Sequence, residues 1–147
     1  MRFFSTYASM AFADAVAATK EALKRQEFTI LAEIDMRQVL KEVSPSILRP
    51  YLILSACSLP LAYRAIKVDD VIGSMLLCDV VIQEHNGGCV KISVVDPVCT
   101  IGTINHVEII SIAEELRSLI QKVMDDVASM LAFIDSIRSA SPAIGIR

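Results

Sequence analysis

The feature that most constrains the fold of this chain is a long apolar stripe near the end of its 147 residues. Between about 107 and 133, apolar residues recur at positions 109, 112, 116, 119, 120, 123, 127, 131 and 134. Spacings of three and four residues are typical of one face of an α-helix. A helix of about 27 residues spans roughly 40 Å, which exceeds the width of a small domain. The helix must therefore curl over a sheet or extend into a partner, and we expect a dimer seam.

The sequence before this helix predicts five strands and three shorter helices. The strands are expected at residues 2–7, 28–36, 51–56, 75–84 and 89–96, and the helices at about 11–26, 37–43 and 60–66. The stretch from Phe28 to Met36 alternates between its two sides, which is the strand period. Ser9 is expected to cap the first helix, because its hydroxyl can accept a hydrogen bond from the first turn.

The last two strands flank the sequence HNGG, which predicts a β-hairpin because Asn and Gly accept the positive φ of tight turns. A turn at its Asn-Gly puts Cys78 opposite Val95, whereas a turn at its Gly-Gly puts Glu84 opposite Lys91. The sequence leaves both registers open. In either register the start of the first strand lies beside the end of the second.

The order of these elements predicts the fold class. We expect an α/β two-layer sandwich, of the α+β kind, with a mostly antiparallel sheet of about five strands that includes a C-terminal hairpin. The sheet packs against helices, among them the long C-terminal helix. We expect one domain over residues 1–138 and a flexible tail over 139–147, where the sequence is rich in small residues.

Composition excludes some classes of partner. The net charge is -3 and the basic residues are scattered, so the sequence predicts no nucleic-acid surface. No stretch of 18 uncharged apolar residues occurs, so no membrane span is expected. Hydrophobic residues make up 54% of the chain, which is high for a soluble domain and favours a buried interface in a homodimer.

The four cysteines, at positions 57, 78, 89 and 99, form no CxxC pair. This usage is typical of a reduced, cytoplasmic protein. No spacing of His and Cys predicts a metal site, and no motif identifies a cofactor or decides whether the chain is an enzyme.

Two of these cysteines are candidates for thiol chemistry. Cys57 lies just before a predicted helix, whose N-terminal dipole would lower a thiol pKa and favour a nucleophile. The alternative is a buried cysteine that acts as a small hydrophobic side chain. Cys78 is a candidate resolving thiol, although its apolar flanks favour the core.

Four polar residues at or beside predicted strand ends complete the candidate site. Asp35 and Asp96 each follow a strand, where a carboxyl can do acid-base work or can cap the next element. Ser58 and Asp79 are the neighbours of the two cysteines. We expect the strand ends that carry these residues to line one pocket.

Four segments carry a resemblance to a known family. They are FADAVAATKEALKRQEFTILAEIDM at 12–36, YLILSACSLPLAYRAI at 51–66, LLCDVVIQE at 76–84 and SVVDP at 93–97. In this order and spacing the chain resembles the bacterial and archaeal domain-of-unknown-function family number 302 over roughly residues 5–130. The resemblance implies a small α/β homodimer without an established reaction, and some members are associated with proteins that handle sulfur or thiols.

The family pattern carries over at some positions and is broken at others. It is kept at Asp35, Cys57, Ala62, Cys78, Asp96 and Pro97. Ser58 and Leu59 replace Asn-Pro, Leu77 and Asp79 replace Pro and Asn, and Glu27 stands where a Gly ends the first helix. A helix end of that kind favours the left-handed conformation.

These observations lead to three functional hypotheses. The first is a homodimeric module that binds a small molecule or a protein. The alternative is a sulfur-transfer or redox protein that uses Cys57, with Cys78 as resolving thiol. The third is an oligomer that holds a metal or haem between its subunits.

Overall fold

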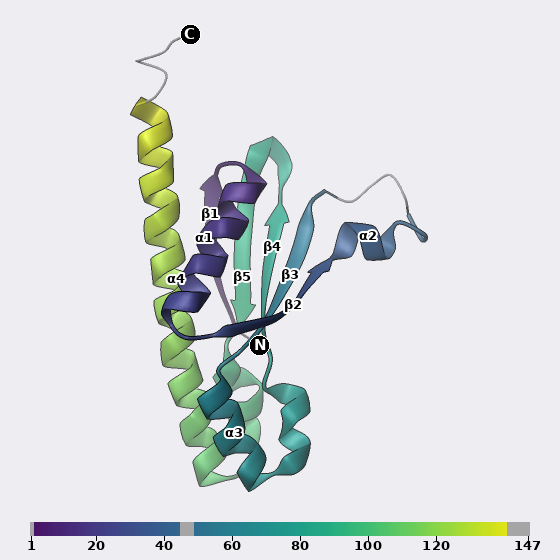
Figure 1. Ribbon diagram of the computed structural model, residues 1–147, viewed down its shortest axis with the longest axis vertical. Coiled ribbons are helices and arrows are strands. Elements are labelled where there is room, and N and C mark those ends of the chain that lie inside the picture. The colour runs from purple at the N-terminus through teal and green to yellow at the C-terminus, as the bar shows by residue number, and fades with distance from the viewer. Residues whose placement is uncertain (1, 45–48, 141–147) are drawn as a thin grey trace.

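The computed structural model describes residues 2–44 and 49–140. Five strands form one antiparallel sheet in the order β1-β5-β4-β3-β2, and helices pack on it (Figure 1). The strands are β1 (Phe3–Ser9), β2 (Thr29–Asp35), β3 (Tyr51–Cys57), β4 (Cys78–Glu84) and β5 (Cys89–Val95). The helices are α1 (Phe12–Arg25), α2 (Met36–Leu40), α3 (Leu59–Val68) and α4 (Val107–Ala140), and short 3₁₀ turns are η1 (Asp70–Met75), η2 (Asn86–Gly88), η3 (Pro97–Cys99) and η4 (Ile101–Thr103). The predicted α+β class is confirmed.

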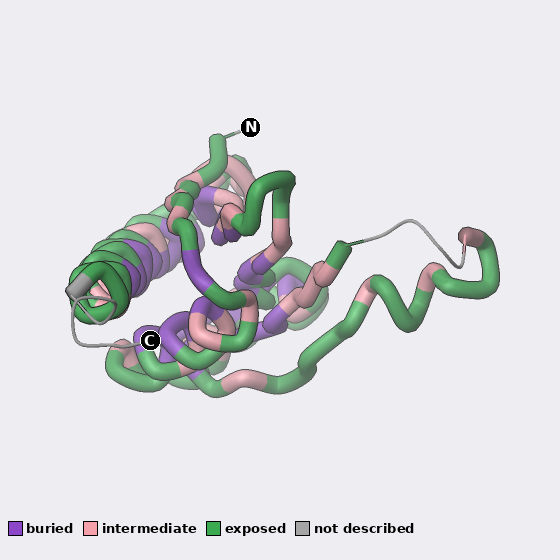
Figure 2. The backbone as a smooth tube through the Cα atoms, turned by 90° about the horizontal axis from the view of Figure 1, so that it is seen from above, coloured by how far each residue is buried: buried purple, intermediate pink, exposed green. Residues whose placement is uncertain are grey.

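Helices α1 and α4 cover one face of the sheet. Alternate residues of the central strands, such as Leu54, Val80 and Ile92, are fully buried against them. In Figure 2 the buried positions gather between these helices and the sheet, while β2 and α2 reach outward and are largely exposed. The core therefore lies on one side of the sheet, and the described residues form no helical layer comparable to α1 and α4 on the other side.

The apolar stripe near the C-terminus forms α4 as predicted. Seven of its nine positions are buried: Ile109, Ile112, Leu116, Ile120, Val123, Val127 and Leu131. The helix runs to Ala140, about two turns beyond its expected end. Residues 141–147, most of the predicted tail, lie outside the described residues. Among the described residues, no helix has the length and apolar character needed to span a bilayer.

The hairpin between β4 and β5 has a register that differs from both predictions. Glu84 pairs with Val90 and Val80 pairs with Val94, so each predicted register is wrong by one residue. The reason is the loop, which holds three residues between His85 and Cys89 rather than a two-residue turn. Both of its glycines have positive φ, and the His85 N–H donates to the Cys89 carbonyl at 2.6 Å.

The predicted cap at Ser9 is also wrong. Ser9 is the last residue of β1, where it pairs with Cys89, because β1 continues along the full length of β5. The N-cap of α1 is Ala11, whose side chain makes no capping hydrogen bond. The helix starts without a polar cap and depends on the packing of its apolar face.

Glu27 ends α1 in the left-handed conformation, with φ of 62°. The Phe28 N–H donates to the Leu23 carbonyl at 3.0 Å, and the Glu27 N–H donates to the Lys24 carbonyl at 2.9 Å. These two bonds define a Schellman motif, in which glycine is the usual residue at the left-handed position. The expectation for this position is confirmed.

Candidate functional site

The structure gathers five of the six predicted site residues at one end of the sheet. Cys57 ends β3, Ser58 follows it, Cys78 begins β4 beside Asp79, and Asp96 follows β5. Because β4 is antiparallel to both β3 and β5, its first residues meet their last residues. This end of the sheet is the lower end in Figure 1, next to α3.

Asp35 lies at the opposite end of the sheet, which corrects the expectation of a shared pocket. In the antiparallel pair of β2 and β3, Asp35 is opposite Leu52 whereas Thr29 is opposite Cys57. Its carboxylate accepts hydrogen bonds from the backbone N–H groups of Arg37 and Gln38, at 3.0 and 3.3 Å. Asp35 is the N-cap of α2, which is the alternative role that the sequence left open.

The environment of the two cysteines does not favour thiolates. Burial raises the pKa of the Cys57 thiol, and burial together with nearby Cys57 and Asp79 raises the pKa of Cys78 to about 12. Cys78 pairs with Ala56 across the strands and shares its helix-covered face, within the apolar core. Cys57 follows Ala56 along β3, so its side chain leaves the strand on the other face. The two thiols are near enough to affect each other electrostatically, but both are buried and neither is favoured as a thiolate, which disfavours a pair of nucleophile and resolving partner.

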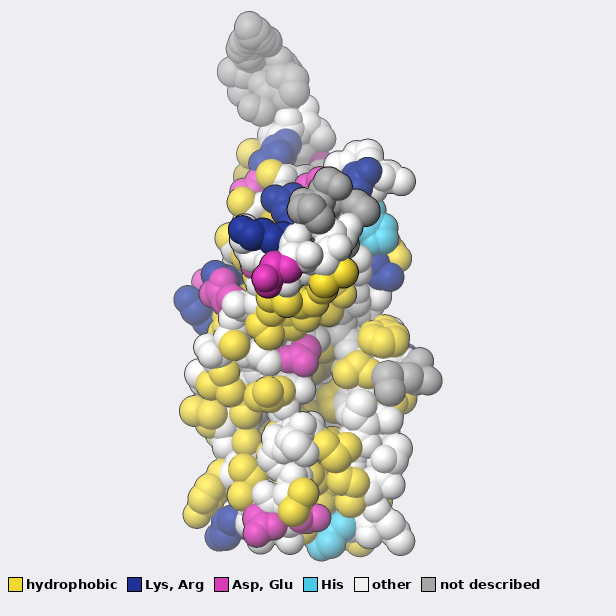
Figure 3. All heavy atoms as spheres, turned by 90° about the vertical axis from the view of Figure 1, so that its right-hand side faces the viewer, with side chains coloured by type: hydrophobic (Ala, Val, Ile, Leu, Met, Phe, Trp, Pro, Cys, Tyr) yellow, Lys and Arg dark blue, Asp and Glu magenta, His cyan; other side chains and the backbone are white. Residues whose placement is uncertain are grey.

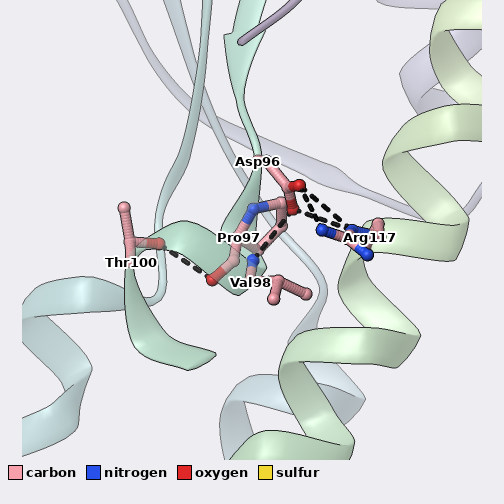
Figure 4. Close-up of polar contacts among 5 residues, drawn as sticks. All are labelled: Asp96, Pro97, Val98, Thr100 and Arg117. Carbon is pink, nitrogen blue, oxygen red and sulfur yellow. Dashed lines mark hydrogen bonds and ion pairs between the residues drawn. The ribbon is translucent and has the colours of Figure 1, made fainter. Parts of the chain in front are cut away.

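Asp96 is fully buried and is bound by Arg117 from α4 (Figure 4). The Arg117 Nε lies 3.1 and 3.0 Å from the two carboxylate oxygens, and its Nη2 lies 2.6 Å from Oδ2. The Val98 N–H also donates to Oδ1, at 2.9 Å. The hydrogen bonds from Arg117 hold the pKa of the Asp96 carboxyl below its usual range, although burial opposes this. Asp96 thus joins β5 and η3 to α4 and is engaged inside the fold.

Ser58 lines a small pocket where the end of α1, the start of α3 and the side of α4 meet. The pocket has a volume of about 260 Å³ and is also lined by Glu27, Pro60, Glu115 and others. Ser58 is the N-cap of α3, but its side chain makes no capping hydrogen bond. Ser58 is buried and offers little surface to the pocket. Most of the pocket wall comes from residues of the three helices.

Asp79 instead lines a groove on the sheet face that α1 and α4 leave uncovered. Its carboxylate accepts a hydrogen bond of 2.5 Å from the Ser55 hydroxyl, the residue directly opposite on β3. The groove has a volume of about 380 Å³. Its lining is formed by Phe3, Ser5, Tyr51, Asp79, Val81, Gln83, Lys91, Ser93, Val94 and Val95. Figure 3 views the molecule from the side opposite α4 and shows hydrophobic side chains grouped across its middle.

The sequence reasoning missed most of this groove, although the signal was present. Asp79, Val81 and Gln83 alternate along β4, and Lys91, Ser93 and Val95 alternate along β5. They alternate with the core positions of the hairpin, and all but the buried Ser93 are exposed or half-buried. The alternate positions of the two strands, taken together, predict one surface that carries both apolar and polar side chains. Arg117 was missed as the partner of Asp96 because helical periodicity places it on the solvent side.

Comparison with protein families decides which family this fold represents. The model of the family described as "Domain of unknown function DUF302" matches residues 4–127. The chain belongs to the DUF302 family. The match begins within β1, at Phe4, includes the other four strands in full and ends within α4, at Val127.

A solved DUF302 structure has the same fold. It is the crystal structure of an uncharacterized conserved DUF302 protein from Bacillus stearothermophilus, with a TM-score of 0.77 and 23% sequence identity. The similarity covers 86% of this chain and 98% of that chain. Among proteins with curated descriptions, none matches this chain. The family and the fold are therefore shown.

The geometry of the groove suits binding better than covalent chemistry. It combines apolar walls with a carboxylate, an amide, two hydroxyls and an ammonium group, from Asp79, Gln83, Ser5, Ser93 and Lys91. Within the described part of the chain, no three His, Cys, Asp or Glu side chains converge as metal ligands. An apolar surface with a few polar groups is the usual composition of a small-molecule site.

Proposed function

We propose that this DUF302 protein is a homodimeric binding module that holds a small organic ligand on the uncovered face of its sheet. The observation that carries the proposal is the groove around Asp79, whose volume of about 380 Å³ lies in the usual range for ligand pockets. Its polar groups are set on neighbouring strands, so the sheet fixes their relative positions.

The residues of the groove suggest the chemistry of the ligand. Tyr51, Val81 and Val95 offer an apolar surface, and Lys91 and Asp79 offer opposite charges. A ligand with an apolar body, an anionic group for Lys91 and a hydrogen-bond donor for Asp79 matches this arrangement. One carboxylate oxygen of Asp79 is bound by Ser55, and the other has no hydrogen-bond partner among the described residues.

The homodimer is supported by the surface composition. Apolar residues make up 54% of the chain, and several large ones stay exposed, including Phe133 and Ile137 near the end of α4. Extended apolar surface is typical of a subunit interface. The buried, high-pKa cysteines give the thiol-dependent alternative less support than the groove gives to binding.

The ligand site can be tested with 8-anilinonaphthalene-1-sulfonate, an apolar probe with one anionic group. We expect saturable binding, with NMR shift changes of backbone amides concentrated at Ser5, Val81, Gln83 and Ser93. The Val81→Glu variant places a negative charge in the middle of the groove, where it repels the sulfonate, and should weaken probe binding about tenfold or more.

The matched control is Leu31→Glu, because Leu31 is an exposed apolar residue on β2, outside the groove. It should bind the probe as the unmodified protein does. Shift changes confined to the pocket beside Ser58, or equal probe affinity in the Val81→Glu variant, would contradict the proposal.

A further inference from the structure

The strand β1 lies at an open edge of the sheet. Within the described residues its one strand partner is β5. The Asp96 N–H donates to the Arg2 carbonyl at 2.8 Å, so Arg2 and Asp96 form a hydrogen-bonded pair. Hydrogen-bonded pairs alternate along an antiparallel ladder. Phe4, Thr6 and Ala8 therefore direct their backbone groups to β5, and Phe3, Ser5, Tyr7 and Ser9 direct theirs outward.

This edge lacks the features that normally protect an edge strand. β1 has seven residues, FFSTYAS, without a charge, a proline or a shift in its pairing register. The other edge strand, β2, has a register shift between Ile30 and Ala32 and carries Glu33 and Asp35. Unprotected edges pair readily with another strand. Only β2 is protected, which indicates that the β1 edge has a partner.

A groove of about 610 Å³ follows the β1 edge. Five consecutive residues, from Arg2 to Thr6, line it. Consecutive side chains of a strand point to opposite faces, so a groove that meets all five follows the edge of the backbone. The other wall is α4, through Gln121, Met124, Asp125 and Ala128, which form one stripe of the helix.

We propose that the β1 edge binds the β1 edge of a second copy of this chain in antiparallel orientation, giving one continuous sheet across a homodimer. The symmetric register has its two-fold axis at Thr6, so that Phe3 pairs with the partner's Ser9 and Ser5 pairs with the partner's Tyr7. In this register every outward N–H and C=O of Phe3, Ser5, Tyr7 and Ser9 meets a counterpart. A neighbouring register leaves some of them unpaired.

A second copy fits this edge better than a charged peptide does. The strand is uncharged between Phe3 and Ser9, so the two β1 strands meet without like charges facing each other. Phe3 and Tyr7 are 60% and 58% exposed on the uncovered face, and the pairing places each near aromatic residues of the partner strand. On the other face, the two α4 helices approach along the stripe that contains Ala128, a residue small enough for close contact.

This inference rests on the proposed homodimer and names its surface, and it does not depend on the ligand of the groove. If the chain is monomeric, the homodimer and this inference both fail. If the chain is dimeric but the β1 edge is not involved, only this inference fails. Probe binding in the groove is a separate measurement, and its result neither supports nor contradicts this inference.

The first test is disulfide trapping in the full chain. In the proposed register the two Thr6 residues face each other in a non-hydrogen-bonded pair, with Cα atoms about 4.5 Å apart, which suits a disulfide. The Thr6→Cys variant, in a chain with Cys89 and Cys99 replaced by Ser, should form a covalent dimer on mild oxidation. Ala8→Cys in the same chain is the control, because Ala8 faces the partner's Phe4 and should not crosslink.

The second test measures the mass of the protein in solution by light scattering. The unmodified chain should have twice its 16.1 kDa mass, and Tyr7→Lys should reduce it to the monomer while the circular dichroism spectrum is unchanged. Leu31→Lys is the matched control, since Leu31 is 55% exposed on the other edge strand, and it should stay dimeric. A dimer that survives Tyr7→Lys, or equal crosslinking of Thr6→Cys and Ala8→Cys, overturns the inference.

Discussion

Asp96, which is fully buried after β5, is bound through both carboxylate oxygens by Arg117 of α4. The two residues connect the sheet to the longest helix (Figure 4). Four other predicted site residues lie at the same end of the sheet. The buried carboxylate has its hydrogen bonds supplied by one guanidinium and one backbone N–H. This arrangement indicates a structural role for Asp96 rather than a ligand contact.

The Asp96→Asn variant tests that role. An amide keeps the shape of the side chain but removes the charge that Arg117 binds, and hydrogen bonds to charged groups stabilise by about 2 kcal/mol. We therefore expect the free energy of unfolding to fall by about 2 kcal/mol. Urea unfolding followed by circular dichroism measures it. The control is Asp135→Asn, an exposed carboxylate on the same helix, which should change stability by less than about 0.5 kcal/mol.

The pKa of Asp96 predicts how stability depends on pH. The carboxyl has a lower pKa in the folded protein, so its contribution is present above the unfolded value of about 3.9 and is lost as pH falls through the folded value. The unmodified protein should lose stability in that acid range more steeply than Asp96→Asn. Urea midpoints measured from neutral pH down to the acid range give both slopes. Parallel curves would show that Asp96 does not contribute this dependence.

At Glu27 we expect a substitution to raise the free energy of unfolding rather than lower it. A non-glycine residue in the left-handed conformation costs about 1 kcal/mol or more, and Glu27 has φ of 62° at the end of α1. Glu27→Gly should therefore raise the free energy of unfolding by up to about 1 kcal/mol. Glu21→Gly, in the interior of α1, is the control and should lower it by about 1 kcal/mol. A loss of stability in both variants would show that the conformation at Glu27 carries no strain.

Local patterns in the sequence predicted the elements of this fold well. The apolar stripe of α4 and the glycine-rich hairpin depend on residues that are close in sequence, and both are found where they were expected. The hairpin register was missed because it depends on how many residues the loop takes, and Gly87 and Gly88 allow several turn types. Ser9 was misassigned because its pairing with Cys89 is a long-range interaction.

The candidate site was predicted less well because it depends on how strands pair. Five residues meet at one end of the sheet, but Asp35 is at the other end, since β2 is antiparallel to β3. Nothing in the sequence of β2 specifies that direction. Local patterns do not predict the partner of Asp96 either, because Arg117 is 21 residues away and helical periodicity places it on the solvent side.

The reactivity of the cysteines follows from their burial and can be measured directly. Iodoacetamide reacts with the thiolate, and burial raises the pKa of Cys57 and raises that of Cys78 to about 12. At neutral pH we expect the half-buried Cys89 and Cys99 to be labelled first, Cys57 slowly, and Cys78 only after unfolding. Mass spectrometry of each cysteine peptide across a pH series gives the four rates, and labelling in urea is the control for intrinsic reactivity. Preferential labelling of Cys57 at a pH below the ordinary cysteine pKa of about 8.5 would contradict this expectation and would favour the thiol-dependent function.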